Sequence, residues 1–177
     1  MSRRRAAFLD RDGVLVETFV RDNRAFAPVS LDEFRLEPNA SILVGRLARA
    51  GLLPIVVTNQ PEVARGIITP AVLEEMHEQL RKAVPVEDIF VCVHDGPDGC
   101  RCRKPKPGML QAAAEKWGID LARSFMVGDR CTDVEAGQAV GCYTVLIERP
   151  YSGAAAPGAR ASDLATAVDA VLARLKE

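Results

Sequence analysis

Short apolar runs alternate with longer segments of helical periodicity, and this alternation constrains the fold of the chain more than any other feature. Each run has the length of one strand that is buried on both faces of a sheet. Repeated strand, helix, strand units connect by right-handed crossovers, which gives parallel strands with helices on both faces. We therefore predict an α/β fold, a three-layer doubly wound parallel sheet. The expected strands are 6–9, 52–57, 89–93, 125–127 and 143–147.

Helix boundaries follow from residues that favour helix starts and ends. A glycine follows three of the periodic segments, and a Thr-Pro pair opens another. Farther along, 150–161 is rich in Gly, Ala and Pro and is expected to be a loose connector before a C-terminal helix over 162–176. The other expected helices are 39–50, ended by Gly51; one opened by Thr69-Pro70; 107–117, ended by Gly118; and one capped by Thr132 or Asp133 and ended by Gly141.

Length and charge limit the kinds of protein that this chain can be. Its 177 residues favour one domain spanning 1–177. The 23 basic and 24 acidic side chains nearly balance, so no overall field attracts nucleic acid or an anionic membrane. The first apolar stretch stops at Asp10, too early for a signal peptide or a membrane span. We expect a cytoplasmic monomer with no nucleic-acid or membrane partner.

Reactive side chains stand at the expected carboxyl ends of four strands, where sheets of this type bind ligands. Asp10 ends the first strand, Thr58-Asn59 end the second, Lys104 follows the third and Asp129 ends the fourth. A single aspartate at such a point is often only a turn former. Independent turns have no reason to supply a carboxylate, a hydroxyl, an ammonium group and another carboxylate in succession. We therefore interpret the set as one active site.

These groups suit phosphoryl transfer. The carboxylate of Asp10 can attack phosphorus, while Asp12 can protonate the leaving alkoxide and then deprotonate the attacking water. Mg²⁺ held by Asp10, Asp129 and the backbone carbonyl of Asp12 would reduce the repulsion between nucleophile and phosphate. Thr58 and Lys104 can stabilise the phosphate oxygens, and Asn59 can orient neighbouring groups. Asp133 is expected to orient Lys104 or a water on the metal.

Four sequence motifs resemble those of the haloacid-dehalogenase superfamily of phosphatases, over residues 8–147. The resemblance implies that Asp10 is the nucleophile, Asp12 the general acid and base, and Asp129 a magnesium ligand. It also implies phosphate or substrate contacts for Thr58 and Lys104 and for the neighbouring motif residues Asn59 and Gln60. The motifs are Asp10-Arg11-Asp12-Gly13-Val14, Thr58-Asn59-Gln60, Arg103-Lys104-Pro105 and Gly128-Asp129.

Segment 92–102 contains Cys92, His94, Cys100 and Cys102, a ligand set that suits tetrahedral Zn²⁺. Because four protein ligands leave no open position for water, we expect a structural zinc ion. It would fix the direction in which the basic side chains directly after Cys102 enter the phosphate site. The alternatives are a disulfide between Cys100 and Cys102, which one intervening residue would strain, and four buried residues without a metal. Cys131 and Cys142 are expected to pack as small apolar groups.

The zinc segment narrows the resemblance to D,D-heptose 1,7-bisphosphate phosphatases and histidinol-phosphate phosphatases. Thr58-Asn59-Gln60 and the run Arg103-Lys104-Pro105-Lys106-Pro107-Gly108-Met109 are more similar to the heptose branch, which implies that Arg103 recognises the substrate. Pro61-Glu62 and Val16 differ from the Ser-Gly pair and the Asn usual in that branch. We predict a sugar phosphatase acting on the 7-phosphate of heptose 1,7-bisphosphate. Histidinol-phosphate hydrolysis and a non-catalytic zinc module that binds phosphorylated ligands are the alternatives.

Two further expectations concern the surroundings of the site. The segments after Asp12 and Thr58 are short, so the site is expected to lack a large cap and to leave substrate choice to loops 16–35 and 60–68 and the zinc segment. His77 lies beside acidic residues in the helix that Thr69 opens, and it is expected to be a solvated surface residue without a function.

Overall fold

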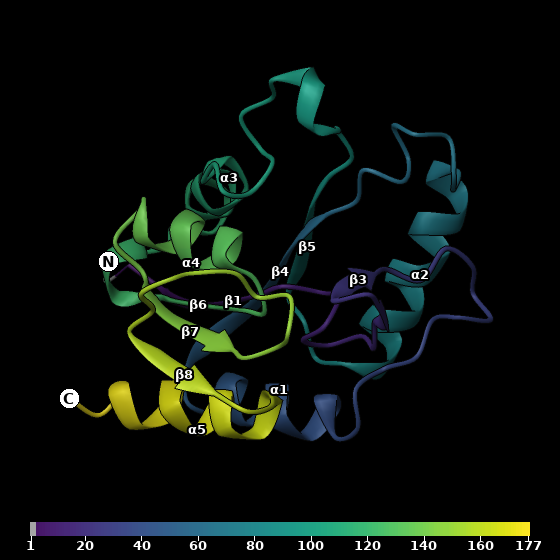
Figure 1. The fold of residues 1–177 in the computed structure, drawn as a ribbon. Helices are drawn as coiled ribbons and strands as arrows, with labels where there is room; N and C mark the ends of the chain where they lie inside the picture. The colour runs from purple at the N-terminus through teal and green to yellow at the C-terminus, as the bar shows by residue number, and fades with distance from the viewer. Residues whose placement is uncertain (1–2) are drawn as a thin grey trace.

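The computed structural model describes residues 3–177 and contains a parallel sheet of six strands in the order β5-β4-β1-β6-β7-β8 (Figure 1). β1 (Arg5–Leu9) lies inside the sheet and pairs with β4 (Leu52–Asn59) on one side and β6 (Phe125–Gly128) on the other. The carboxyl ends of these three strands are therefore neighbours. The predicted parallel sheet is confirmed. Its remaining strands are β5 (Asp88–Cys92), β7 (Tyr143–Ile147) and β8 (Ala159–Ala161).

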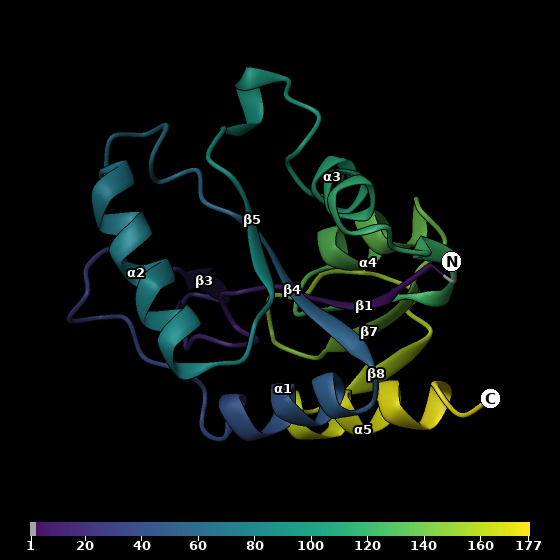
Figure 2. The same ribbon diagram turned by 180° about the vertical axis from the view of Figure 1, so that it is seen from behind.

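Alternate residues of β1 enter two separate hydrophobic clusters, as the period of two along a strand requires. Ala7 and Leu9 face the cluster shared with α1, α2 and α5, whereas Ala6 and Phe8 face the cluster shared with α3 and α4. The two groups of helices cover opposite faces of the sheet (Figure 2). The helices are α1 (Ala40–Arg49), α2 (Pro70–Ala83), α3 (Gly108–Trp117), α4 (Cys131–Gln138) and α5 (Leu164–Arg174).

The helix boundaries agree with the sequence except at α4. The Thr69 hydroxyl accepts a hydrogen bond from the backbone of Val72 at the start of α2, and Gly118 ends α3 in a left-handed conformation. The start of α4 is earlier than a Thr132 or Asp133 cap would place it. Asp133 lies in the first turn and accepts from the backbone N–H of Arg130, so its carboxylate caps the helix from inside.

Three short strands differ from the sequence expectation, because three residues are too few to show a period. β8 lies within the expected loose connector 150–161 and pairs with β7. β2 (Phe19–Arg21) and β3 (Arg24–Phe26) form a hairpin in loop 16–35, turning at Asp22 and Asn23, which both have positive φ. β5 is an edge strand and is only partly buried, contrary to the expectation of burial on both faces.

Short 3₁₀ segments complete the described structure: η1 (Gly96–Asp98) in the zinc segment and η2 (Leu121–Arg123) before β6. Among residues 3–177, no helix combines the length and the apolar character that crossing a membrane requires.

Candidate active site

A pocket of about 500 Å³ opens at the carboxyl ends of β1 and β4. Of the residues predicted to form the site, Asp10, Asp12, Asn59, Arg103 and Lys104 line it. Asp10 follows β1, Asn59 ends β4, and the two cations follow the zinc segment. The β2–β3 hairpin forms another wall of this pocket, so loop 16–35 borders the site as expected.

Lys104 is buried and joins three parts of the site. Its Nζ lies 2.9 Å from Asp10 Oδ1 and 2.6 Å from Asp133 Oδ1, and it donates to the carbonyl of Val57 at 2.8 Å. Burial acts to lower the pKa of Lys104, but the charges of Asp10 and Asp133 outweigh it and raise that pKa above its ordinary value. Lys104 therefore enters the site as a cation that is paired with Asp10 and Asp133.

Asn59 holds the backbone of Lys104 rather than its ammonium group. The Asn59 side chain donates to the Lys104 carbonyl and accepts from the Lys104 N–H, both at 3.1 Å. This pair of hydrogen bonds connects the end of β4 to the segment that follows the predicted zinc ligands.

Oxygen atoms of Asp10, Asp129 and Asp133 lie within 4.8 Å of one another, and all three residues are buried. Burial, followed by the charges of Asp10 and Asp133, raises the pKa of Asp129 to about 8. Within residues 3–177, no group donates a hydrogen bond to the buried Oδ1 of Asp129. These hard oxygen donors with excess negative charge fit a divalent cation such as Mg²⁺.

Gly13 has no side chain, and the carboxylate of Asp129 occupies the space that a side chain would fill. Its φ is +83°, and a Cβ at this position would lie 1.9 Å from Asp129 Oδ2. Glycine is therefore needed both for the backbone conformation and for the approach of β6 to the turn after β1.

Two neighbouring side chains hold the carboxylate of Asp12. Arg11, which is fully buried, donates from Nε to Asp12 Oδ1 at 2.9 Å and from Nη2 to Oδ2 at 3.0 Å. Gln60 donates to the same Oδ2 at 2.6 Å. Arg11 also donates to Gln60 Oε1 at 2.9 Å, so the three side chains form one network.

Gln60 and Thr58 are not among the residues that line the pocket. Both are buried, and the Gln60 amide donates to the Thr58 hydroxyl at 2.9 Å. The side chain of Gln60 contacts Asp12 and Arg11. The substrate contact that the sequence motif implies for Gln60 stays a prediction.

The expectation that His77 is a solvated surface residue is wrong. His77 is only 2% exposed, and Arg11 Nη1 lies 3.3 Å from its Nε2. Because a guanidinium group has only donors, Nε2 must accept and Nδ1 must carry the proton. The sequence places His77 beside the acidic residues of α2 but does not show that this face of the helix packs against a buried arginine.

Burial, then the charge of Arg11, lowers the pKa of His77 to about 4, below its ordinary value of 6.5. The unfolded chain therefore binds the proton more readily, and folding stability should fall as the pH drops from about 6.5 towards 4. Between pH 7 and pH 5, this group should lower the free energy of unfolding by about 2 kcal/mol. We expect His77→Gln to remove that part of the pH dependence in urea denaturation. Equal pH dependence of both proteins would contradict the prediction.

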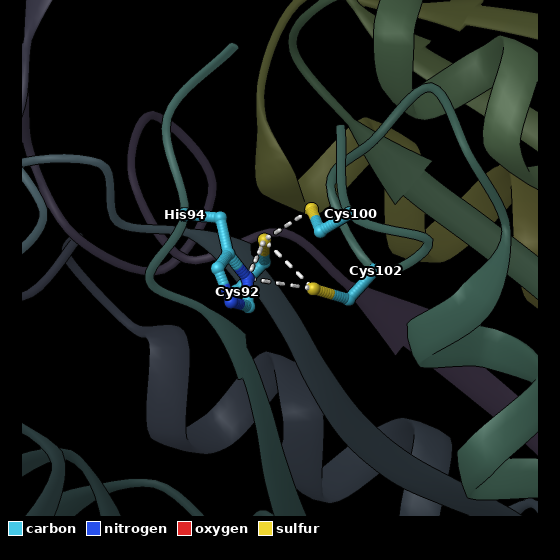
Figure 3. A group of neighbouring side chains, drawn as sticks. All are labelled: Cys92, His94, Cys100 and Cys102. Atoms are coloured by element: carbon cyan, nitrogen blue, oxygen red, sulfur yellow. Dashed lines mark hydrogen bonds between the residues drawn. The ribbon is translucent and has the colours of Figure 1, made fainter. Parts of the chain in front are cut away.

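The four predicted zinc ligands come together at the end of β5 (Figure 3). Cys92 Sγ lies 3.6 Å from both His94 Nδ1 and Cys100 Sγ, and 2.9 Å from Cys102 Sγ. Tetrahedral zinc with Zn–S bonds of about 2.3 Å would place sulfur atoms about 3.8 Å apart, which is close to the Cys92–Cys100 separation and longer than the Cys92–Cys102 separation. All five cysteines are free thiols, so no Cys100–Cys102 disulfide forms.

The zinc segment forms a hydrogen bond with Arg103 and an ion pair with loop 60–68. Arg103 donates from Nη1 to the His94 carbonyl at 3.2 Å, and Arg65 of loop 60–68 forms an ion pair of 2.7 Å with Asp95. Cys142 is buried in the core as expected, whereas Cys131 is partly exposed and lines the pocket.

Comparison with known proteins places this arrangement in a family. Residues 101–177 match the HAD-hydrolase-like family. The D-glycero-beta-D-manno-heptose-1,7-bisphosphate 7-phosphatase of Pseudomonas aeruginosa is 40% identical over 148 residues, which cover 79% of this chain and 79% of that protein. The D-glycero-alpha-D-manno-heptose-1,7-bisphosphate 7-phosphatase of Photorhabdus laumondii is 32% identical over 164 residues, covering 84% and 86%.

A solved structure shows the same fold. The D,D-heptose 1,7-bisphosphate phosphatase of Bordetella bronchiseptica, complexed with magnesium and phosphate, is 31% identical and superposes with a TM-score of 0.83 over 96% of this chain and 99% of that chain. The sequence motifs, the sheet and these relatives agree, and the chain belongs to the haloacid-dehalogenase-like hydrolases as one of their phosphatases.

Proposed function

We propose that this chain is a D-glycero-D-manno-heptose 1,7-bisphosphate 7-phosphatase that works through an aspartyl phosphate on Asp10. The observation that supports this most is the convergence of Asp10, Asp12 and Lys104 on one pocket, in a chain whose relatives carry that name. The two relatives differ in the anomer in their names, so the anomer that this chain prefers is part of the test.

Each side chain has a distinct part in the proposed reaction. Asp10 Oδ1 accepts from the backbone N–H of Arg11 at 2.8 Å and pairs with Lys104, which leaves Oδ2 as the oxygen to attack phosphorus. Lys104 balances charge on the transferring group, and Asp12 protonates the leaving alkoxide, then takes a proton from water. Arg103, on the pocket wall, would contact the rest of the substrate.

Asp10 and Asp129 are the proposed ligands of Mg²⁺, together with the backbone carbonyl of Asp12. Asp133 adds a third buried carboxylate beside them. When bound, Mg²⁺ would supply positive charge that lowers the repulsion between the Asp10 carboxylate and the phosphate oxygens. The Arg11 and Gln60 hydrogen bonds would meanwhile hold Asp12 in a fixed orientation beside the pocket.

Phosphate release tests the substrate. The panel contains both anomers of heptose 1,7-bisphosphate, histidinol phosphate and fructose 1,6-bisphosphate, each with Mg²⁺. We expect kcat/KM for one heptose anomer to exceed that for the non-heptose compounds by ~100-fold, about 2.7 kcal/mol in the transition state. A preference for histidinol phosphate would overturn the substrate assignment and keep the chemistry. Absence of release from every compound would favour a phosphate-binding module instead.

We also propose that Cys92, His94, Cys100 and Cys102 bind one structural Zn²⁺. Metal analysis of the purified protein should find about one zinc ion per chain. Cys102→Ser should lose that zinc and lower the free energy of unfolding by several kcal/mol, on the order expected when metal binding is coupled to folding. Cys142→Ala is the matched control, because Cys142 is remote from the four ligands in sequence and should keep the zinc. Unchanged stability without metal would exclude the structural role.

The chain is further proposed to act as a single domain and a monomer in the cytoplasm. The five cysteines form no disulfide, and the proposed thiolate ligands suit a reducing compartment. Sedimentation of the zinc-loaded protein checks the oligomeric state, and a dimer mass would contradict the proposal.

A further inference from the structure

The first residues of segment 150–161, for which the sequence predicts a loose connector, lie at the active site. Tyr151 donates from its hydroxyl to Asp129 Oδ2 at 2.7 Å. Ser152 donates from Oγ to the Asp129 carbonyl at 2.7 Å, and its own carbonyl accepts from the Cys131 N–H at 2.7 Å. Two consecutive residues therefore hold both the side chain and the backbone of Asp129.

The phenol of Tyr151 is itself fixed from two sides. The Arg130 guanidinium lies 5.4 Å from the ring centroid, and Thr18 Oγ1 lies 3.3 Å from the hydroxyl oxygen. A phenol has one proton to donate. Since the shorter contact is to the Asp129 carboxylate, that proton goes to Asp129, and Thr18 donates to Tyr151.

The two oxygens of Asp129 consequently have different surroundings. Oδ2 receives the hydrogen bond of Tyr151, whereas the buried Oδ1 receives none within residues 3–177. Rotation of the carboxylate would break the Tyr151 bond. The hydrogen bond therefore occupies Oδ2 and leaves Oδ1 unpaired, in a residue whose carboxylate lies beside those of Asp10 and Asp133.

We propose that Tyr151 is a positioning residue for magnesium, which keeps Asp129 Oδ1 directed to a divalent cation. The inference rests on the proposed metal site. Groups that orient a metal ligand through hydrogen bonds commonly change metal affinity by ~10–100-fold when removed. The same segment that continues into β8 would thus contribute to the metal site without providing a ligand.

Calorimetric titration of MgCl₂ into magnesium-free, zinc-loaded protein tests the proposal without a substrate. Tyr151→Phe removes only the hydroxyl and should weaken Mg²⁺ binding ~10-fold. With enough Mg²⁺ to saturate the variant, kcat should return to within about two-fold of the wild type. Tyr143→Phe is the matched control, because Tyr143 is the other tyrosine and also donates to an oxygen, the Gly158 carbonyl, at 2.8 Å. It should bind Mg²⁺ as the wild type does.

Asp129→Asn separates the inference from the metal site on which it rests. If Asp129→Asn loses Mg²⁺ binding while Tyr151→Phe binds like the wild type, the role of Tyr151 is refuted and the metal site stands. If Asp129→Asn binds Mg²⁺ as tightly as the wild type, the metal assignment fails and the inference fails with it. Weaker binding in both variants, with Tyr143→Phe unchanged, supports the proposal.

Discussion

Asp10→Asn is expected to lower kcat by about 10⁴-fold or more, because an amide cannot act as the nucleophile that forms the acyl phosphate. The substitution keeps the shape of the side chain and removes one of three buried carboxylates that lie within 4.8 Å of one another. Affinity for the phosphorylated substrate should therefore persist or improve. Single-turnover phosphate release and substrate titration measure the two quantities separately.

Loss of activity in Asp10→Asn must be distinguished from loss of the fold. Lys104 keeps its 2.6 Å contact with Asp133 in this variant, so no buried cation is left unpaired and unfolding by urea should change little. Asp169→Asn, which alters an exposed carboxylate paired with Arg46, is the control and should retain full turnover. Appreciable turnover by Asp10→Asn would exclude Asp10 as the nucleophile and contradict the proposed mechanism.

Lys104→Met should produce the largest loss of stability, roughly 3–5 kcal/mol in the free energy of unfolding. The substitution replaces a cation with an apolar chain of similar length. Asp10 and Asp133 are then left buried without the ammonium group that lies between them. Turnover should also fall, since no cation remains at this position to balance charge on the phosphate. Urea denaturation and steady-state kinetics measure the two effects.

A second substitution tests whether the loss of stability comes from the unpaired carboxylates. Lys104→Met combined with Asp133→Asn removes one of those charges and should recover part of the stability, without recovering activity. Residues in direct contact commonly show such coupling in double-mutant cycles, by ~0.5–3 kcal/mol. Additive losses would show that Lys104 stabilises the protein through packing instead of through its charge.

The sequence by itself determines the strands of the sheet, because a buried strand requires a run of apolar residues. Each inner strand must be apolar on both faces, and each crossover helix must carry one apolar face, so the alternation is visible in the residues alone. The grouping of the reactive residues follows from the parallel sheet, because parallel strands bring their carboxyl ends to one edge. The residue pattern alone therefore predicts the positions of Asp10 and Lys104 and the clustering of the four cysteine and histidine ligands.

Only the tertiary structure shows which groups hold those reactive residues in place. Arg11 and His77 are buried and Tyr151 is partly buried, and the residue pattern does not predict their contacts with the site and its supporting network. The motif of Gln60 implies a substrate contact, but it does not show that the buried Gln60 amide donates to Asp12. The physical reason is that a hydrogen bond between distant residues depends on the relative positions of packed elements, and polar side chains carry no periodic pattern that encodes those positions.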